Sequence, residues 1–306
     1  MNRAIFIVGP TGTGKSDVAV ELSKTIPSEI ISCDSMQVYK GMDIGTGKAS
    51  KEILSTAPHH LIDIIKPSED FNVAKYIYYV QIALEKIKNH NKIPIFVGGS
   101  GLYINSIVYG LCGAPAQVPE IRARILKEQD RKGIEYLFKK LKSVDPVAAS
   151  KIEGFNLRRI VRALEVFEAT GIAISRYREK TESIISNYAV KMFGLTMERQ
   201  KLYNRINKRV VNMFDMGLVR EVKNLSQNKM SWTSSKALGY KEVIDCLKKN
   251  ISLEDTISLV QRNTRRYAKR QMTWFKKNKN IKWIDVEDKA SEDIANQIFS
   301  FTAGDR

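Results

Sequence analysis

The octapeptide Gly9-Pro10-Thr11-Gly12-Thr13-Gly14-Lys15-Ser16 decides the fold of this 306-residue chain. It satisfies the pattern G-x-x-x-x-G-K-[ST] in full, and it lies between an apolar run at 4–8 and a helix pattern at 15–22. Glycines let such a loop curl so that its N–H groups point at phosphate oxygens, and the helix N-terminus adds partial positive charge. We therefore predict a phosphate-binding loop in which Lys15 reaches the terminal phosphates and the Ser16 hydroxyl ligates Mg²⁺.

Further short apolar runs surround this motif in a pattern typical of a parallel sheet. The runs at 29–32 and 93–97 lack polar alternation and are separated by helical stretches such as 73–88. Buried parallel strands are apolar without alternation because helices cover both of their faces. Strand patterns return at 190–197 and 281–286, with helix patterns near 199–227 and 253–275 and a last helix after them. The predicted fold class is α/β, a parallel sheet core with helices on both faces.

The pattern changes after Gly113, where two prolines, Pro115 and Pro119, interrupt the chain. From 120 to 180 the sequence is almost wholly helical, with amphipathic stretches at 120–131 and 157–169. We therefore expect an all-helical insertion at 114–189, set into a core formed by 1–113 and 190–306.

The basic charge is concentrated in the later part of the chain. The sequence has 50 Lys+Arg and 33 Asp+Glu. Residues 1–113 contain 11 basic and 10 acidic residues, so residues 114–306 contain 39 and 23, a net charge of +16. This asymmetry favours a polyanionic partner, because Lys and Arg displace condensed counterions from a phosphate backbone. A lysine-rich, solvated surface explains the same charge equally well.

Several other classes of protein are excluded. Cys33, Cys112 and Cys246 are scattered without a CxxC pair, and no apolar run approaches the ~20 residues of a membrane span. The first strand begins at Arg3, so no secretory signal fits before it. We expect a cytoplasmic protein without disulfides, a zinc ribbon or a membrane anchor.

An aspartate stands where the sheet is expected to carry its chemistry. The run at 93–97 ends in Gly98-Gly99-Ser100, without the metal-binding acid of the usual nucleotide hydrolases. Asp34 instead follows the run at 29–32, and therefore lies at the carboxyl edge of the sheet, as the loop does. A carboxylate there suits a general base or a partner that contacts a ligand of a metal ion, and the competing interpretation is a helix N-cap.

Seven segments occur in one family's order across nearly the whole chain. They are GPTGTGKS (9–16), DSMQVYKGMDIGTGK (34–48), PHHLIDI (58–64), GGSGLY (98–103), RIVRALEV (159–166), ALGY (237–240) and TRRYAKRQMTW (264–274). Together they resemble the tRNA dimethylallyltransferases, also called tRNA isopentenyltransferases. The resemblance implies a P-loop kinase-like core with an inserted helical domain that grips the tRNA anticodon stem-loop. It also implies Mg²⁺-assisted transfer of the dimethylallyl group from dimethylallyl diphosphate to N6 of the adenosine immediately 3′ of the anticodon.

The resemblance also implies roles for individual residues. Asp34 would take the proton from the adenosine amine, and the Ser100 hydroxyl would align that amine. Lys15, the loop and Mg²⁺ would stabilise the departing diphosphate. Arg205 and Arg209 are expected to reach the diphosphate or the tRNA, with a surface position as the alternative. The expected diphosphate site thus comprises Gly9, Pro10, Thr11, Gly12, Thr13, Gly14, Lys15, Ser16 and Arg205.

Other segments are expected to contact tRNA. The residues concerned are Asp34, Ser35, Met36, Gln37, Ser100, Arg122, Arg158, Arg159, Ile160, Val161, Arg162, Lys236, Gly239, Tyr240, Lys241, Arg265, Lys269, Arg270, Gln271 and Trp274. The spacing of Arg262, Arg265, Arg266 and Lys269 predicts one basic helix face suited to an RNA backbone, with Trp274 placed in the core. Two positions depart from the family pattern: the family often has Thr at Ser100 and Gln at Arg158.

Two other functions fit parts of the sequence. A small-molecule or nucleotide kinase would use the loop and Asp34 but leaves the basic later part unexplained. An RNA-binding ATPase would need the acid that is missing after Val97. For the pair His59-His60 we prefer a structural role to a metal site, because neighbouring residues on a strand point to opposite sides. A monomer is expected, since no repeated apolar surface face stands out.

Overall fold

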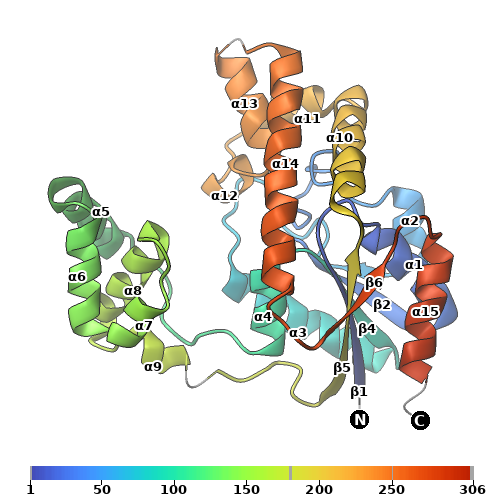
Figure 1. Cartoon of the computed structure of the whole chain (residues 1–306), viewed down its shortest axis with the longest axis horizontal. Coiled ribbons are helices and arrows are strands. Elements are labelled where there is room, and N and C mark those ends of the chain that lie inside the picture. The colour runs from blue at the N-terminus through green and yellow to red at the C-terminus, as the bar shows by residue number, and fades with distance from the viewer. Residues whose placement is uncertain (1, 179–180, 250, 304–306) are drawn as a thin grey trace. The chain divides into compact units, whose positions relative to one another are not determined.

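The computed structural model describes residues 2–178, 181–249 and 251–303, and Figure 1 shows the course of the chain. The chain divides into two compact units, one formed by residues 1–104 with 187–306 and the other by residues 105–186. The second unit begins and ends earlier in the sequence than the insertion expected at 114–189.

The first unit is built on a six-stranded sheet whose neighbouring strands are all parallel. The strand order is β3-β2-β4-β1-β5-β6. The strands are β1 (Asn2–Val8), β2 (Ser28–Cys33), β3 (His59–His60), β4 (Ile93–Gly98), β5 (Tyr188–Thr196) and β6 (Ile281–Asp285). The predicted α/β class is confirmed, and each apolar run interpreted as a strand is a strand.

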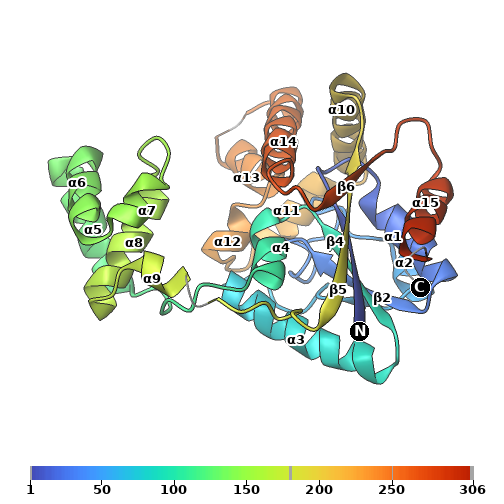
Figure 2. The same ribbon diagram turned by 60° about the horizontal axis from the view of Figure 1, so that its bottom comes forward.

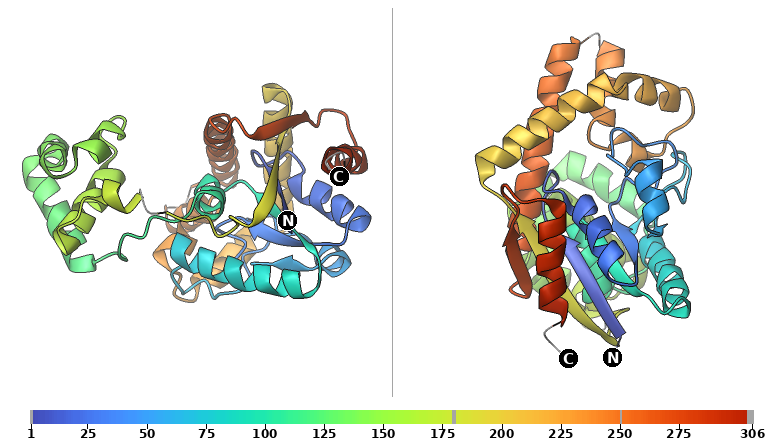
Figure 3. Two further views of the ribbon diagram at one scale, coloured as in Figure 1. Left: turned by 90° about the horizontal axis from the view of Figure 1, so that it is seen from below. Right: turned by 90° about the vertical axis from the view of Figure 1, so that its right-hand side faces the viewer.

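Helices cover both faces of this sheet, which explains why its strands are apolar without alternation. Helices α1 (Lys15–Thr25) and α15 (Ser291–Ala303) lie on one face, and α3 (Val73–Asn89) lies on the other (Figures 2 and 3). Ile5 and Ile7 of β1 belong to the core on the α1 side. Phe6 points to the opposite face and stacks on Phe96, with ring centroids 4.4 Å apart. Both sets of side chains are therefore buried.

A layer of helices stands beyond the carboxyl ends of the strands, as the right-hand view of Figure 3 shows. It contains α10 (Arg199–Asp215), α11 (Leu218–Ser226), α12 (Trp232–Ser235), α13 (Tyr240–Lys249) and α14 (Leu253–Phe275). The helix expected near 199–227 is two helices, because Gly217 between them has a φ of 98°, which breaks the helical path. Helix α2 (Lys51–Thr56) precedes β3, and α4 (Gly101–Val108) follows β4.

The second unit is helical throughout its regular structure. Its helices are α5 (Pro119–Lys132), α6 (Ile134–Val144), α7 (Pro146–Ser150), α8 (Leu157–Thr170) and α9 (Ile174–Arg178). Ile125, Leu137, Ile160 and Leu164 form the centre of its core and are fully buried. The unit therefore has a hydrophobic core of its own.

One buried acid connects α8 with α5 and with the segment before α5. The carboxylate of Glu165, on α8, is fully buried and accepts a hydrogen bond from the Val118 N–H at 2.9 Å. The guanidinium groups of Arg122 and Arg162 each lie 3.3 Å from the same carboxylate. Arg162 also donates to the Pro115 carbonyl. A buried carboxylate requires such partners, because burying it unpaired would cost several kcal/mol.

The expected structural role of the histidine pair agrees with the contacts around Glu29. His60 Nε2 and His90 Nδ1 each lie 2.7 Å from a different oxygen of the buried Glu29 carboxylate. Lys92 lies 3.4 Å from the same group. His59 instead contacts the Ala57 carbonyl. Across the described part of the chain, no helix combines the length and apolar character needed to cross a membrane.

Candidate active site

The phosphate-binding loop leaves β1 at a point where only glycine fits. Gly9 has a φ of 139°, and a Cβ built on it would lie 2.6 Å from the Leu195 carbonyl oxygen of β5. Inside the loop, the Thr13 hydroxyl and the Lys15 ammonium both donate to the Pro10 carbonyl, at 2.9 and 2.7 Å. The loop is thus held in its curled form by its own side chains.

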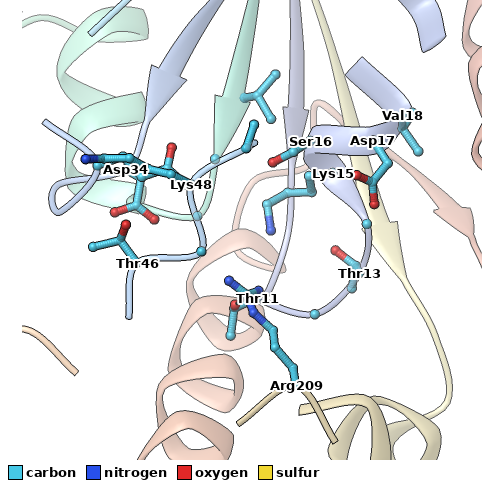
Figure 4. A pocket seen from close by; sticks show the side chains of 18 of the residues that line it. Thr11, Thr13, Lys15, Ser16, Asp17, Val18, Asp34, Thr46, Lys48 and Arg209 are labelled. Carbon is cyan, nitrogen blue, oxygen red and sulfur yellow. Dashed lines mark hydrogen bonds between the residues drawn. The ribbon is translucent and has the colours of Figure 1, made fainter. Parts of the chain in front are cut away.

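Two cations meet at this loop. Lys15 and Arg209, which comes from α10, both reach toward the centre of the pocket in Figure 4. Arg209 donates to the Thr11 hydroxyl at 3.1 Å. Burial, with the charge of Arg209 nearby, lowers the pKa of Lys15 to about 7, although Asp34 opposes this change. Burial also lowers the pKa of Arg209. A bound anion would relieve the repulsion between the two groups.

Asp34 follows β2 and faces the same space. Its Oδ1 accepts the Met36 N–H at 2.8 Å, which closes a turn. No helix begins here, and the next described helix starts at Lys51, so the helix N-cap interpretation is wrong. Burial raises the pKa of Asp34, and Lys15 and Arg209 act in the opposite direction. The carboxylate is therefore a stronger proton acceptor than an exposed aspartate.

Two adjoining cavities surround these groups. A cavity of about 930 Å³ follows the loop and is lined by Lys15, Ser16 and Arg205 among others. A second, of about 340 Å³, has an apolar wall that includes Ile206, Val210, Met213, Leu238 and Val260. Thr11, Asp34, Arg209 and Tyr267 line both cavities. Asp34 and Arg209 thus stand where the cavity along the phosphate loop meets the cavity with the apolar wall.

Ser100 and Tyr267 complete this edge of the sheet. The Ser100 N–H donates to the Cys33 carbonyl at 3.2 Å, which places Ser100 beside the turn that carries Asp34. Burial raises the pKa of Tyr267 to about 12, although a hydrogen bond with the Ser100 side chain lowers it. The Ser100 hydroxyl is therefore held by a neighbouring phenol.

The sequence and fold of the chain are similar to those of known proteins. The family model described as IPP transferase matches residues 37–278. The tRNA dimethylallyltransferase of Caldanaerobacter subterraneus subsp. tengcongensis is 47% identical over 310 residues, covering 99% of this chain and 98% of the relative. The chain belongs to this family.

Solved structures of the family have the same fold. The tRNA isopentenylpyrophosphate transferase of Bacillus halodurans has a TM-score of 0.74 and 40% identity, covering 99% of this chain and 96% of that one. A eukaryotic dimethylallyltransferase, described as acting on tRNA, has a TM-score of 0.81 at 28% identity, covering 98% of this chain and 80% of that one. The P-loop core with a helical insertion expected from the sequence is therefore the architecture shared with IPP transferases.

Four residues of the second unit expected at tRNA take part in the packing of that unit. Ile160 and Val161 are 0% and 1% exposed, so their side chains belong to the core and cannot contact RNA. The guanidinium groups of Arg122 and Arg162 are bound to the buried Glu165. Arg158 and Arg159, on the same helix, are exposed.

Three residues of the first unit expected at tRNA have positions that serve the fold. Tyr240 is fully buried and donates to Glu221 at 2.6 Å. Arg265 donates to Asn207 of α10 at 2.5 Å, so it does not share an exposed face with Lys269. Gln271 is 7% exposed. Its amide accepts the Thr11 N–H at 2.9 Å and donates to the Gly99 carbonyl at 3.0 Å, bracing the phosphate loop against the Ser100 turn.

The remaining expected tRNA residues lie on cavity walls or on the surface. Trp274, expected in the core, is 39% exposed and packs against Gly101. Lys241 and Lys269 are exposed. Ser35, Met36, Lys236, Gly239 and Arg270 line the smaller cavity, and Gln37 lines the larger.

Several groups at this site were given too small a role, or none, in the sequence-based predictions. Arg209 contacts the phosphate loop. Arg205, one helical turn earlier, was expected at the diphosphate, but it is exposed on the wall of the larger cavity. Thr46 and Tyr267 line both cavities and were not assigned a role. Thr46 lies in the quoted segment 34–48, so the family motif was the available signal. Tyr267 lies in the family segment 264–274, so the same signal was available for it.

The lowered pKa of Lys15 predicts pH-dependent anion binding. Below pH 7 Lys15 is already charged, and an anion binds it without proton uptake. Above about pH 7 the free enzyme must take up a proton to bind an anion there, so affinity for inorganic pyrophosphate should fall as the pH rises. Calorimetry at pH 6 to 9 in buffers of different ionisation enthalpy measures both effects. Lys15→Arg, which stays charged, corrects for the titration of pyrophosphate; the same pH profile in both proteins would contradict the prediction.

Proposed function

We propose that this chain transfers the dimethylallyl group from dimethylallyl diphosphate to N6 of the adenosine 3′-adjacent to the anticodon of a tRNA. The observation that carries the proposal is the meeting of Asp34 with Lys15 and Arg209 at one pocket. The reaction needs cations for a leaving diphosphate and a base for an amine proton, and this pocket offers both. The names of the relatives support the same chemistry.

The phosphate loop serves the leaving-group half of the reaction. As the allylic C–O bond breaks, negative charge grows on the diphosphate. Lys15 and Arg209 already stand at the loop, so little reorganisation is needed when that charge develops. The apolar wall of the adjoining cavity suits a five-carbon allyl group, since it can cover the group and exclude water.

The residues at the loop also suit Mg²⁺. Ser16 is an exposed residue in the first turn of α1 and lines the larger cavity, as do Asp17 and Asp34. The available donors are therefore the oxygens that this hard cation prefers. We propose that the Ser16 hydroxyl would hold Mg²⁺ at this loop. When bound, the ion would neutralise negative charge on the phosphate oxygens.

Asp34 and Ser100 serve the nucleophile half of the reaction. The exocyclic amine of adenine is a weak nucleophile, and its product stays cationic until a proton leaves. Asp34 accepts that proton, and its raised pKa suits it to do so. The Ser100 hydroxyl, held by Tyr267, aligns the amine. Because one chain supplies all of these groups, the proposal requires only a monomer.

A direct assay tests the proposed reaction against the kinase alternative. Unmodified tRNA is incubated with the enzyme and either labelled dimethylallyl diphosphate or γ-labelled ATP. Prenyl label in the adenosine 3′ of the anticodon supports the proposal. Transfer of phosphate from ATP to a small molecule, with no prenyl label in tRNA, overturns it.

Replacing the proposed base should affect turnover and spare RNA binding. Asp34→Asn keeps the shape and the hydrogen bond to Met36 but accepts no proton. We expect a loss of roughly 10² to 10⁴ in turnover, as is typical for a missing general base, with tRNA affinity within a few-fold of wild type. Single-turnover rates and filter binding measure the two quantities. Nearly full turnover would remove Asp34 from catalysis.

The division of arginines between surface and core predicts which of them bind RNA phosphates. We expect Arg159→Ala and Lys269→Ala to flatten the slope of log affinity against log salt by about 0.7 to 0.9 each, because both residues are exposed. Arg265→Ala should leave the slope unchanged, since Arg265 is bound to Asn207. Equal slope changes for all three variants, measured by tRNA binding between 50 and 200 mM salt, would show that this division is wrong.

A further inference from the structure

Residues of segment 43–48 line both cavities, and the start of the segment is held by one carboxylate of α11. Glu221 Oε2 accepts the N–H groups of Asp43 and Ile44 at 3.1 and 2.8 Å, and Oε1 accepts that of Gly45 at 3.2 Å. Oε1 also accepts the Tyr240 hydroxyl at 2.6 Å. Four donors therefore converge on one carboxylate, which accepts hydrogen bonds more strongly than a neutral group can.

The path of the segment is tight around these contacts. A Cβ built on Gly45 would collide with the ring of Tyr240. At the far end, the Lys48 ammonium, whose side chain is 4% exposed, donates to Asp43 at 2.7 Å and to the Tyr39 carbonyl at 2.6 Å. The segment is thus a closed loop fastened at both ends, and its middle residues, Thr46 and Gly47, line the larger cavity.

The middle of the segment contacts the arginine of the active site. Gly47 has a φ of 60°, and a Cβ built there would collide with the Arg209 guanidinium. On its other side Arg209 donates to the Thr11 hydroxyl of the phosphate loop. The guanidinium is therefore confined between the backbone of segment 43–48 and the phosphate loop. Its position depends on where that segment lies.

We propose that Glu221 is a positioning residue: by fixing segment 43–48, it holds Arg209 against the phosphate loop in the orientation that receives a diphosphate. Glu221 lines neither cavity and touches no reacting group; it acts through the segment and Arg209. Its role in turnover rests on the proposed function, but its effect on diphosphate binding does not. Without the carboxylate, the three N–H groups would turn to water and the guanidinium would lose one of its two confining walls.

The first experiment measures binding of inorganic pyrophosphate to Glu221→Gln by calorimetry at pH 6.5. The glutamine amide keeps one acceptor oxygen. Its NH₂ group replaces the other oxygen and cannot accept hydrogen bonds from the donors that face it. We expect pyrophosphate affinity to fall about tenfold, which equals about 1.4 kcal/mol, and tRNA affinity to stay within twofold. Glu221→Asp, which keeps the charge, should recover part of the loss. Glu85→Gln, an exposed position in the middle of α3, removes the same charge and should change neither affinity.

A merely structural role gives a different pattern. It would lower the melting temperature of Glu221→Gln but leave pyrophosphate affinity at 25 °C at the wild-type value, and that result overturns the proposal. If Glu221→Gln does not fold, Gly47→Ala tests the same link from its other end. The added methyl group should displace Arg209 and weaken pyrophosphate binding, and wild-type affinity in Gly47→Ala would equally overturn the proposal.

A double-mutant cycle tests whether Glu221 acts through Arg209. In an Arg209→Ala background, Glu221→Gln should change pyrophosphate affinity by less than twofold, because the group it positions is gone. Additive losses would overturn the proposed route. With dimethylallyl diphosphate and tRNA, Glu221→Gln should raise KM for the diphosphate more than it lowers kcat. If wild-type enzyme prenylates no tRNA while the pyrophosphate results hold, the proposed function fails and the positioning role stands.

Discussion

The close approach of two cations at the phosphate loop is the constraint on which the site depends. Burial lowers the pKa of both Lys15 and Arg209, and the charge of Arg209 lowers that of Lys15 further. Such an arrangement does not persist by itself, since the side chains would separate to regain hydration. Lys15 is held by the Pro10 carbonyl, and Arg209 by Thr11 and the backbone at Gly47. The neighbouring loops thus hold a site that is electrostatically prepared for an anion.

The same two cations also govern the base. Burial raises the pKa of Asp34, and the positive charges of Lys15 and Arg209 oppose that increase. A diphosphate bound between them would cancel part of their effect, so the carboxylate would become a better proton acceptor once the leaving group is in place. Occupation of the phosphate loop and strength of the base are therefore coupled by Coulomb interactions alone, without any movement of the backbone.

The fold, and the polar groups at the carboxyl edge of the sheet, could be predicted from the sequence because both follow from local patterns. Apolar runs and the glycine-rich loop predict strands and a phosphate site from neighbouring residues alone. The contacts of Gln271 with Thr11 and Gly99 join segments far apart in the chain, and no local pattern reveals them. The N–H groups of residues 43–45 and their acceptor Glu221 are likewise far apart in the sequence. Gln271 and residues 43–45 lie in family segments, which marked them as important without showing what they touch, whereas Glu221 lies in none of those segments.

The basic residues of the later sequence show why composition alone overstates the number of basic side chains that can face RNA. On α8, Arg158 and Arg159 face outward, but Arg162, one turn later, binds the buried Glu165. Helix α14 divides its basic residues in the same way, with Arg265 bound to α10 and its neighbours exposed. Helical periodicity alone did not reveal this division. It follows from which face of each helix packs against a neighbour, because a guanidinium at that boundary satisfies a protein oxygen before it can meet a phosphate.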